Sequence, residues 1–284
     1  MEENKLNIFH LSDTHFTKAI PDAPGGFDAP SVVDDGTRLR RVLQTSLSYA
    51  QKPDLFLITG DLVHEGDAED YKRYRALLDE CCEGIPYYVC LGNHDRHQAF
   101  YEGFLGESER TGPYFYSTMQ DGLRIIALDS SPVDATILGK VTREQLDFLK
   151  KELSCPAPKG TIVILHHPPR GVIYESFSAH CPEMEELAAL LESGEVRGVF
   201  SGHTHFVSCS GKHGVLYSTA SSTAFSMEMR EADRGMVFSN RSTFNLIRID
   251  EENLFVGTED MDDKKVLLRI SAEKMEQLIK QEIG

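Results

Sequence analysis

Five short polar clusters hold most of the side chains in this sequence that could do chemistry, and each follows an apolar run. In chain order they read Ser12-Asp13-Thr14-His15, Thr59-Gly60-Asp61-Leu62, Gly92-Asn93-His94-Asp95, His166-His167-Pro168-Pro169 and Gly202-His203-Thr204-His205. They supply carboxylates, imidazoles and one amide, with no thiol among them. A purely structural turn is satisfied by Asn-Gly or Asp-Gly and needs no imidazole. The mixture therefore favours a site where some side chains bind a cation and another moves a proton.

The cluster at residues 92–95 combines three chemical capacities in consecutive positions. Gly92 frees the backbone, Asn93 offers a neutral amide oxygen, and His94 adds an imidazole, the side chain most suited to moving a proton near neutral pH. Alone, this tetrapeptide is only moderately specific, and an isolated Asp-x-His is more often a strand-end cap. In an extended segment, however, residues two apart share a face, so Asp13 and His15 can point at one object.

Strands and helices in alternation are expected to position these clusters. Continuous apolar runs predict buried strands, and a 3.6-residue spacing predicts the helices between them. The expected strands that precede the clusters are Leu6–Leu11, Asp54–Ile58, Pro86–Cys90, Thr161–Leu165 and Val196–Phe200. The expected helices are Thr37–Ala50, Asp67–Cys82, a helix that ends at Leu153 and opens with a capping box of Thr142 and Gln145, and Pro182–Leu191.

The last third of the chain changes to short strand-like runs. These runs are Val215–Tyr217, Phe244–Ile249, Leu254–Val256 and Val266–Ile270, and a helix at Ala272–Ile283 follows them. A hairpin of Tyr114–Thr118 with Leu123–Asp129 is expected earlier in the chain. This order predicts a layered α/β sandwich with two sheets and helices outside. In open α/β sheets ligands bind beyond the carboxyl ends of strands, so we expect the five clusters to meet at one place.

Length and composition indicate one domain. At 284 residues with 40% hydrophobic content, the chain can bury a large core. We expect a single domain over 1–284, with a core at about 6–258 and a C-terminal strand and helix at 264–284 packed on it. Two irregular stretches, Arg170–Cys181 and Ser218–Asn240, are expected to set specificity.

Charge and cysteine usage exclude several classes of protein. The 29 basic and 45 acidic residues give a net charge of −16, which disfavours a nucleic acid polymer as partner. The six cysteines form no C-x-x-C pair, and reduced thiols are expected. No apolar run is long enough to span a bilayer, so we expect a cytoplasmic protein without a membrane partner. The expected partner is a small-molecule substrate, and a homo-oligomer stays open.

Seven side chains from the clusters form a set of oxygen and imidazole donors without a thiolate. They are Asp13, His15, Asp61, Asn93, His166, His203 and His205. Such a set suits Mn, Fe, Co or Zn better than Mg or Ca. Seven donors are too many for one tetrahedral zinc, but they fit two adjacent ions, about 3.5–4 Å apart, that share one carboxylate. Two divalent cations, two aspartates and one hydroxide sum to about +1, which attracts a phosphate in an acidic protein.

The motifs D-x-H, G-D, G-N-H-D, H-x-P and G-H-x-H, in this order, resemble the calcineurin-like metallophosphoesterase superfamily. Further details, among them Leu128-Asp129-Ser130 and His166-His167-Pro168-Pro169, resemble class III cyclic nucleotide phosphodiesterases and bacterial glycerophosphodiesterases. The resemblance covers roughly Ile8 to Ile249. It implies a four-layer α-β-β-α sandwich with two mixed β-sheets. It also implies metal-dependent hydrolysis of small phosphodiesters, with 3′,5′-cyclic nucleotides first and glycerophosphodiesters or broader phosphoesters as alternatives.

The resemblance also implies a role for each matching residue. Asp13, His15 and His205 would hold one ion, Asn93, His166 and His203 would hold the other, and Asp61 would bridge them. Mn or Fe are the first candidates, with Zn or Co as alternatives. His94 matches the family's imidazole near the leaving group, and Asp95 is expected to be a helix cap or a hydrogen-bond acceptor.

The remaining histidines are given no part in the chemistry. His166 is preferred to His167 as the ligand because it directly follows the apolar run, and consecutive strand residues face opposite ways. For His167, contact with substrate, packing and solvation all stay open. His97 is expected to lie solvated in the first turn of a helix. His10, His64, His180 and His213 match no motif.

Two departures from the motifs of related enzymes argue against a protein phosphatase and a lipid A precursor hydrolase. Ser/Thr protein phosphatases have an Arg shortly after G-D, where this chain reads Leu62-Val63-His64-Glu65-Gly66, and lipid A precursor hydrolases have Arg in place of His94. Repair nucleases usually have extra domains and a basic surface. Some superfamily members are non-catalytic scaffolds that have lost ligands, whereas the ligand set here is complete.

Overall fold

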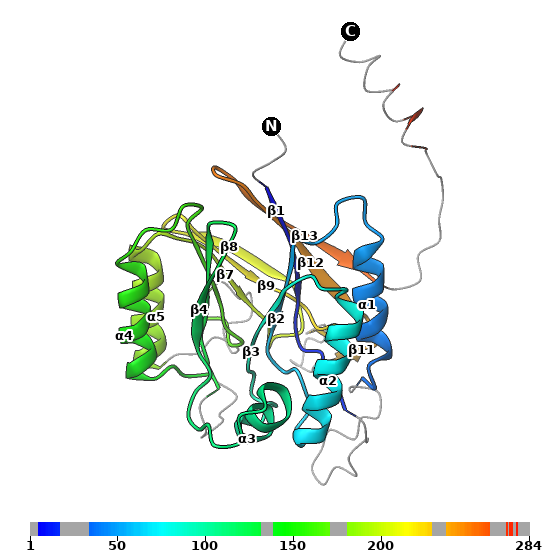
Figure 1. Ribbon diagram of the computed structural model, residues 1–284. Helices are drawn as coiled ribbons and strands as arrows, with labels where there is room; N and C mark the ends of the chain where they lie inside the picture. Colours follow the sequence, from blue (N-terminus) through cyan, green and yellow to red (C-terminus); the bar gives the residue numbers. More distant parts are fainter. Residues whose placement is uncertain are drawn as a thin grey trace.

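Two β-sheets lie face to face, with a pair of helices on the outer side of each (Figure 1). The computed structural model describes residues 5–17, 34–131, 139–170, 181–228 and 237–261, with positions 271, 273, 274 and 277. This four-layer α-β-β-α arrangement confirms the fold class predicted from the sequence.

The first sheet has the order β13-β12-β1-β2-β3. Its parallel strands are β1 (Leu6–Leu11), β2 (Leu55–Thr59) and β3 (Tyr87–Cys90). The strands β12 (Thr243–Ile249) and β13 (Leu254–Asp260) extend it in antiparallel fashion. The helices α1 (Thr37–Leu47) and α2 (Ala68–Cys81) cover its outer face.

The second sheet has the order β4-β5-β6-β7-β9-β8. Its strands are β4 (Tyr116–Gln120), β5 (Leu123–Ala127), β6 (Thr161–Ile164), β7 (Val196–Ser201), β8 (Ser208–Lys212) and β9 (Val215–Thr219). The strands β5, β6, β7 and β9 run parallel, and the two edge strands are antiparallel. The helices α4 (Arg143–Leu153) and α5 (Pro182–Ser193) cover the outer face.

The core between the sheets explains why the strands read as uninterrupted apolar runs. Strands buried on both faces need apolar side chains at every position rather than at alternate ones. In β2 all five residues are buried, with Leu55 and Leu57 facing the second sheet and Phe56 and Ile58 facing the helices. Phe200 of β7 belongs to the layer between the sheets and is fully buried.

The carboxyl ends of the parallel strands of both sheets meet at one edge, which is the lower edge in Figure 1. The segments that leave β1 and β2 stay hydrogen-bonded beyond the sheet. The Asp13 N–H donates to Gly60 O at 3.1 Å and the His15 N–H donates to Asp61 O at 2.9 Å. Two of the polar clusters are therefore locked together by the backbone alone.

The predicted capping box at Thr142 forms only in half. The Thr142 hydroxyl accepts a hydrogen bond from the Gln145 N–H at 3.3 Å, as a capping box requires. The Gln145 side chain does not return to the cap, however. Its Oε1 accepts from the Asp129 N–H at 2.7 Å and its Nε2 donates to Asp129 O at 2.9 Å. Gln145 thereby satisfies the backbone just beyond β5.

Several observed elements were not predicted, and several predicted elements lie outside the described residues. The polar strand β8, the short ribbon of β10 (Ser226–Glu228) and β11 (Val237–Ser239), and the helical turn η1 (Tyr101–Leu105) were not predicted, since they show no clear apolar periodicity. The helix α3 (His97–Phe100) begins at His97, as expected. The predicted strand at 266–270, nearly all of the helix at 272–283, and residues 171–180 and 229–236 of the two specificity stretches lie outside the described residues. None of the described helices has the length and apolar character needed to cross a membrane.

Candidate metal centre

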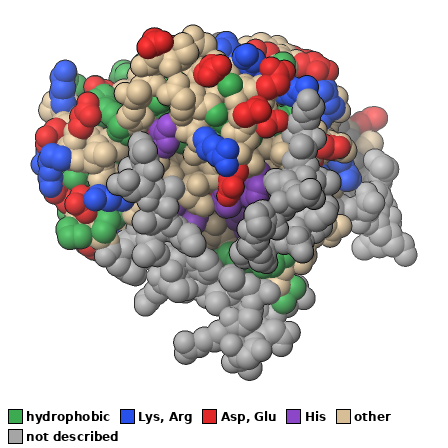
Figure 2. Space-filling view, turned by 90° about the horizontal axis from the view of Figure 1, so that it is seen from below, with side chains coloured by type: hydrophobic (Ala, Val, Ile, Leu, Met, Phe, Trp, Pro, Cys, Tyr) green, Lys and Arg blue, Asp and Glu red, His purple; other side chains and the backbone are tan. Residues whose placement is uncertain are grey.

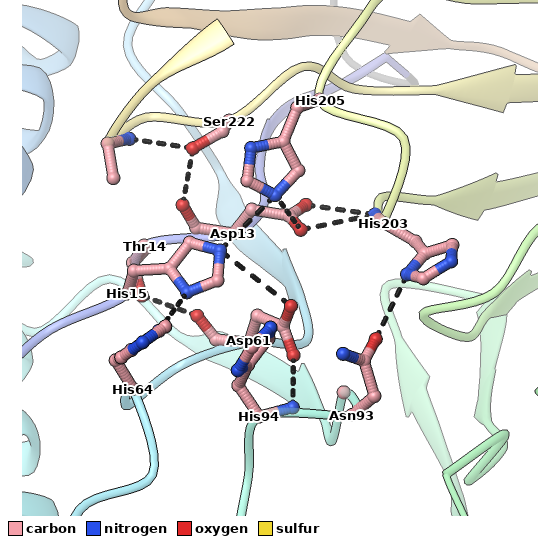
Figure 3. A network of polar contacts seen from close by, with 12 residues as sticks. Asp13, Thr14, His15, Asp61, His64, Asn93, His94, His203, His205 and Ser222 are labelled. Carbon is pink, nitrogen blue, oxygen red and sulfur yellow. Dashed lines mark hydrogen bonds and ion pairs between the residues drawn. The ribbon is translucent and has the colours of Figure 1, made fainter. Parts of the chain in front are cut away.

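The seven predicted ligands lie together at the edge where the strands of both sheets end. Figure 3 labels all of them except His166. Asp13 and His15 follow β1, Asp61 follows β2, Asn93 follows β3, His166 follows β6, and His203 and His205 follow β7. Five of these side chains are almost completely buried, while Asn93 and His203 are partly exposed. They divide into two adjoining groups.

The first group consists of Asp13, His15, Asp61 and His205, whose donor atoms all lie within 4.8 Å of one another. The Nε2 atoms of His15 and His205 are 3.2 Å apart. His205 Nε2 is 3.0 Å from Asp13 Oδ1, and His15 Nε2 is 3.7 Å from Asp61 Oδ2. Two imidazole nitrogens and two carboxylates thus converge on one small volume.

The second group brings together Asn93, His166 and His203. Asn93 Oδ1 lies 3.2 Å from His166 Nε2 and 3.0 Å from His203 Nδ1. Asp61 Oδ2 lies 3.3 Å from the same His166 nitrogen. Asp61 is therefore the carboxylate that faces both groups.

His167 lies closer to the second group than its position in the strand led us to expect. It is buried, so it is not solvated, and its ring centroid is 4.3 Å from that of His203. Its Nδ1 lies 2.9 Å from the Ser130 hydroxyl, which also accepts the His167 N–H. Its Nε2 has no hydrogen-bond partner among the described residues. His167, His166 and His203 together form a set of nitrogen donors that could hold an ion.

The electrostatics of the cluster call for a positive charge. Burial alone would raise the pKa of Asp61, but the neighbouring histidines, His166 first, lower it well below the usual value. Burial alone would lower the pKa of His166, but the charges of Asp61 and Asp13 raise it to about 9. With no cation present, a proton on His166 would partly compensate the two carboxylates. A divalent ion supplies the same compensation more completely.

The donor atoms fit such an ion by their chemistry. The Nε2 lone pairs of His15 and His205 face each other across 3.2 Å, and Nδ1 of His205 is already engaged, since it donates to Phe225 O at 3.0 Å. Two lone pairs that face each other beside two carboxylates need a cation or a proton between them. Imidazole and carboxylate donors without thiolate suit borderline divalent metals.

The backbone at the ligands is strained. Nine described residues other than glycine have positive φ, and five of them are predicted ligands: Asp13 (50°), His15 (41°), Asp61 (47°), His203 (70°) and His205 (54°). The left-handed region costs about 1–2 kcal/mol for such a residue. Strain of this kind persists where the surrounding structure over-determines it, which is typical of functional sites.

The Asp95 carboxylate ties the segment after β2 to the segment after β3. It accepts hydrogen bonds from the Gly92 N–H (2.8 Å), the Leu62 and Val63 N–H groups (3.1 Å each) and the Tyr71 hydroxyl (2.7 Å). Of the two roles predicted for Asp95, the structure shows the hydrogen-bond acceptor. The helix α3 starts after Arg96 without a side-chain cap.

Two glycines of the motifs are required by close approach. A Cβ at Gly92 would collide with the backbone and side chain of Asp61, and a Cβ at Gly202 would collide with Ser12 and Asp13. The glycines in G-N-H-D and G-H-x-H therefore let neighbouring strand ends come close enough to bring their ligands together.

His94 lies at the mouth of the site without joining either ligand group. Its N–H donates to Asp61 Oδ1 at 2.8 Å, and its side chain is 33% exposed. A pocket of about 510 Å³ opens beside it, lined by residues that include Asn93, His94, Arg96 and Tyr101. Figure 2 looks onto this edge and shows histidine side chains at the surface beside acidic and basic ones. His94 thus lies between the predicted ligands and the solvent.

His64 belongs to the site although no motif includes it. Its Nδ1 lies 3.0 Å from Nδ1 of His15, and its ring stacks on that of His94 at 4.6 Å with an angle of 19°. The sequence has no local signal for this role of His64, because it depends on a tertiary contact. The segment after β2 pairs with the segment after β1 through a bridge between Phe16 and Val63. That pairing places His64 beside His15.

His97 is not solvated as predicted. It begins α3, but its Nε2 lies 2.6 Å from Oδ2 of the fully buried Asp129, and its side chain is only 13% exposed. Asp129 also accepts the Tyr114 and Ser131 N–H groups. Burial alone would lower the pKa of His97, but the hydrogen bond and the charge of Asp129 raise it above the usual value.

Comparisons with known proteins agree on one family. A model described as calcineurin-like phosphoesterase matches residues 6–207. A protein of Rhodococcus erythropolis named "probable cyclic nucleotide phosphodiesterase" is 36% identical over 226 residues, which cover 78% of this chain and 72% of the relative. A protein of Mycobacterium tuberculosis named as a cAMP/cGMP dual specificity phosphodiesterase is 32% identical over 231 residues, which cover 80% and 70%.

A further relative and a solved structure complete the comparison. A protein of Arcobacter nitrofigilis named "probable glycerophosphodiester phosphodiesterase" is 30% identical over 225 residues, which cover 76% of this chain and 77% of the relative. The crystal structure of a dimetal phosphatase from Danio rerio superposes with a TM-score of 0.56 at 13% identity, covering 89% of this chain and 99% of that one. At this identity the structural likeness shows the fold alone.

The ion pair of His97 and Asp129 predicts a defined dependence of stability on pH. Because the pKa of His97 is raised in the folded state, its contribution is complete below the unfolded pKa of about 6.5 and is lost as the pH rises through the folded pKa. His97→Gln is therefore expected to lower the free energy of unfolding more at about pH 5.5 than at about pH 8.5. Urea unfolding of both proteins across this range measures the difference. A difference that stays constant with pH contradicts the assignment, and in an Asp129→Asn background the pH dependence should vanish.

Proposed function

The chain belongs to the calcineurin-like phosphoesterase family, and we propose that it hydrolyses small phosphodiesters at a centre of two divalent metal ions. Membership confirms the family expected from the motifs and makes the protein a hydrolase of phosphoester bonds. The observation that carries the proposal is the position of Asp61, whose Oδ2 lies 3.7 Å from His15 Nε2 and 3.3 Å from His166 Nε2. One carboxylate faces both groups of donors.

The ligand groups suggest how the ions would be held. Asp13, His15 and His205 would bind one ion and Asn93, His166 and His203 the other, with Asp61 between them. The family implies divalent ions. Because the set mixes imidazoles with oxygen donors and lacks thiolate, we favour Mn or Fe, with Zn or Co as alternatives.

The residues around the ligand groups divide the work of hydrolysis. When bound, the ions would neutralise charge on the phosphoryl group and activate a water molecule for attack on phosphorus. His94 would give a proton from its imidazole to the leaving ester oxygen, so that an alcohol departs instead of an alkoxide. The hydrogen bond from the His94 N–H to Asp61 keeps this acid and the shared carboxylate in fixed relative positions. The pocket beside His94 leaves room for the departing group.

Charge and the named relatives favour a diester, and 3′,5′-cyclic nucleotides are our first candidate. A diester has one negative charge, which a centre of about +1 can bind without the additional arginine that suits a dianionic monoester. Two relatives at 36% and 32% identity are named for cyclic nucleotides. Glycerophosphodiesters are the second candidate, because a relative at 30% identity is named for them. The complete ligand set argues against a non-catalytic scaffold.

Asp61→Asn is expected to abolish activity and to reduce the number of tightly bound ions. The asparagine Oδ1 can still accept the His94 N–H, so the local backbone is kept while the shared negative charge is lost. Activity on a phosphodiester and metal content after dialysis measure the two effects, and thermal unfolding checks that the fold is kept. A control at an exposed position of α4, Asp147→Asn, should change neither metal content nor thermal unfolding. Wild type that is fully active with a single bound ion would refute the two-ion centre.

His94→Asn is expected to lower kcat by about 10²–10⁴-fold while metal content stays normal, because an imidazole that is not a ligand contributes proton transfer only. The loss should be large for alkyl diesters, whose leaving group needs a proton. It should be small for activated aryl diesters such as bis(p-nitrophenyl) phosphate. Equal losses on both substrates, or loss of metal, contradict the role of His94 as the acid.

The substrate class is tested by comparing kcat/KM for cyclic AMP, glycerophosphoethanolamine and a phosphomonoester, each with Mn and with Fe supplied. We expect cyclic AMP to be the best of the three. A preference for the monoester would reject the diester class. A large preference for the glycerol diester would replace the first candidate by the second.

A further inference from the structure

The three histidine ligands with identified outward partners are held in different ways. A ligand imidazole that binds a metal through one nitrogen is oriented by the hydrogen bond that its other nitrogen donates. Nδ1 of His166 donates to Thr59 O at 2.8 Å, and Nδ1 of His205 donates to Phe225 O at 3.0 Å. Both partners are backbone carbonyls. Nδ1 of His15 instead faces a side chain, Nδ1 of His64, at 3.0 Å.

The protons of the His15–His64 pair can be assigned from the position of the ligand group. Nε2 of His15 faces Asp61 and His205, so with the proposed ion bound there its lone pair would face the ion and its proton would be on Nδ1. Across 3.0 Å one of the two Nδ1 atoms must donate and the other accept. Nδ1 of His64 is therefore the acceptor, and the proton of His64 is on Nε2.

His64 is itself held firmly enough to orient a neighbour. Its N–H donates to Phe16 O at 2.9 Å, and the next N–H, that of Glu65, donates to His94 O at 2.9 Å. Its ring stacks on His94 at 4.6 Å. The chain on both sides of His64 is thus tied to the segments after β1 and β3, and the ring has little freedom to turn.

We propose that His64 is a positioning residue for the ion held by Asp13, His15 and His205: its Nδ1 accepts a hydrogen bond from the His15 Nδ1–H, and this bond aims His15 Nε2 into the ligand group. The proposal rests on the two-ion centre proposed above. It gives a role to a histidine that lies outside every motif of the sequence. Because the partners of His166 and His205 are carbonyls, His15 is also the ligand among these three whose orientation a single side-chain substitution can test.

Three variants separate the hydrogen bond from the stacked ring. His64→Phe keeps a ring against His94 but removes the acceptor. His64→Asn keeps an oxygen acceptor near the position of Nδ1 but removes the ring. His213→Phe removes a histidine whose side chain is 66% exposed and pairs with Glu192, away from the ligand groups, and controls for the loss of one imidazole.

The readout is the affinity of the full-length protein for Mn²⁺, obtained by competition with a chelator, with thermal unfolding of the metal-free protein measured alongside. We expect His64→Phe to weaken binding of one ion by about 10–100-fold and to leave the other near the wild-type value. The affinity of His64→Asn for Mn²⁺ should be close to that of wild type, and the affinity of His213→Phe should equal it. The metal-free variants should unfold at similar temperatures.

The outcomes distinguish this inference from the proposed function. Wild type that binds no ion or only one tightly overturns the two-ion centre and this inference with it. Two tight ions in wild type and unchanged affinities in His64→Phe overturn the role of His64 alone. Loss in His64→Asn as large as in His64→Phe also overturns it, since a retained acceptor would then not preserve metal binding.

Discussion

Two carboxylates, those of Asp13 and Asp61, are buried where the two sheets meet, and the arrangement of this edge follows from that constraint. An uncompensated buried charge costs several kcal/mol, so each carboxylate must receive hydrogen bonds or positive charge. The backbone supplies part of this, since the His203 N–H donates to Asp13 and the His94 N–H donates to Asp61. Imidazoles from three different strand ends, those of His15, His166 and His205, face the carboxylate oxygens. A bound cation completes the compensation that the protein alone leaves partial.

The rigidity of the sandwich makes this concentration of charge and strain possible. Five of the proposed ligand residues have left-handed backbone, at about 1–2 kcal/mol each, so the local backbone conformation of the site is unfavourable. The Asp95 carboxylate offsets some of this, because it fixes three backbone N–H groups and one hydroxyl of the segments around the ligands. Both sheets pack through a layer of fully buried side chains, and the strand ends inherit their positions from that layer. The packing between the sheets thus stabilises the fold enough to maintain the strained backbone at its edge.

The parts of this picture that the sequence predicts are those with a local signature. Buried parallel strands appear as apolar runs, and the polar clusters that follow them lie at the common edge, so the fold and the gathering of the ligands could be anticipated. Contacts between distant segments could not. His64 reaches His15 through the pairing of two loops. Gln145 bonds the backbone of Asp129 instead of its helix cap, and His97 contacts the buried carboxylate of the same Asp129. Each of these polar side chains has a good local alternative, and only tertiary structure decides against it.

The same distinction between local and long-range effects explains how a chain of net charge −16 can act on an anion. Charges farther than about 8 Å from the site are largely screened at physiological ionic strength, so the acidic surplus acts weakly on a substrate in contact with the centre. The exposed Glu65 is closer, 3.6 Å from His94 Nδ1, but it also lies 3.7 Å from Arg96, whose charge offsets it. The ligand groups, as far as the structure describes them, contain no arginine. The proposed centre of about +1, with nearly neutral surroundings at its opening, would therefore match a singly charged diester better than a dianionic monoester.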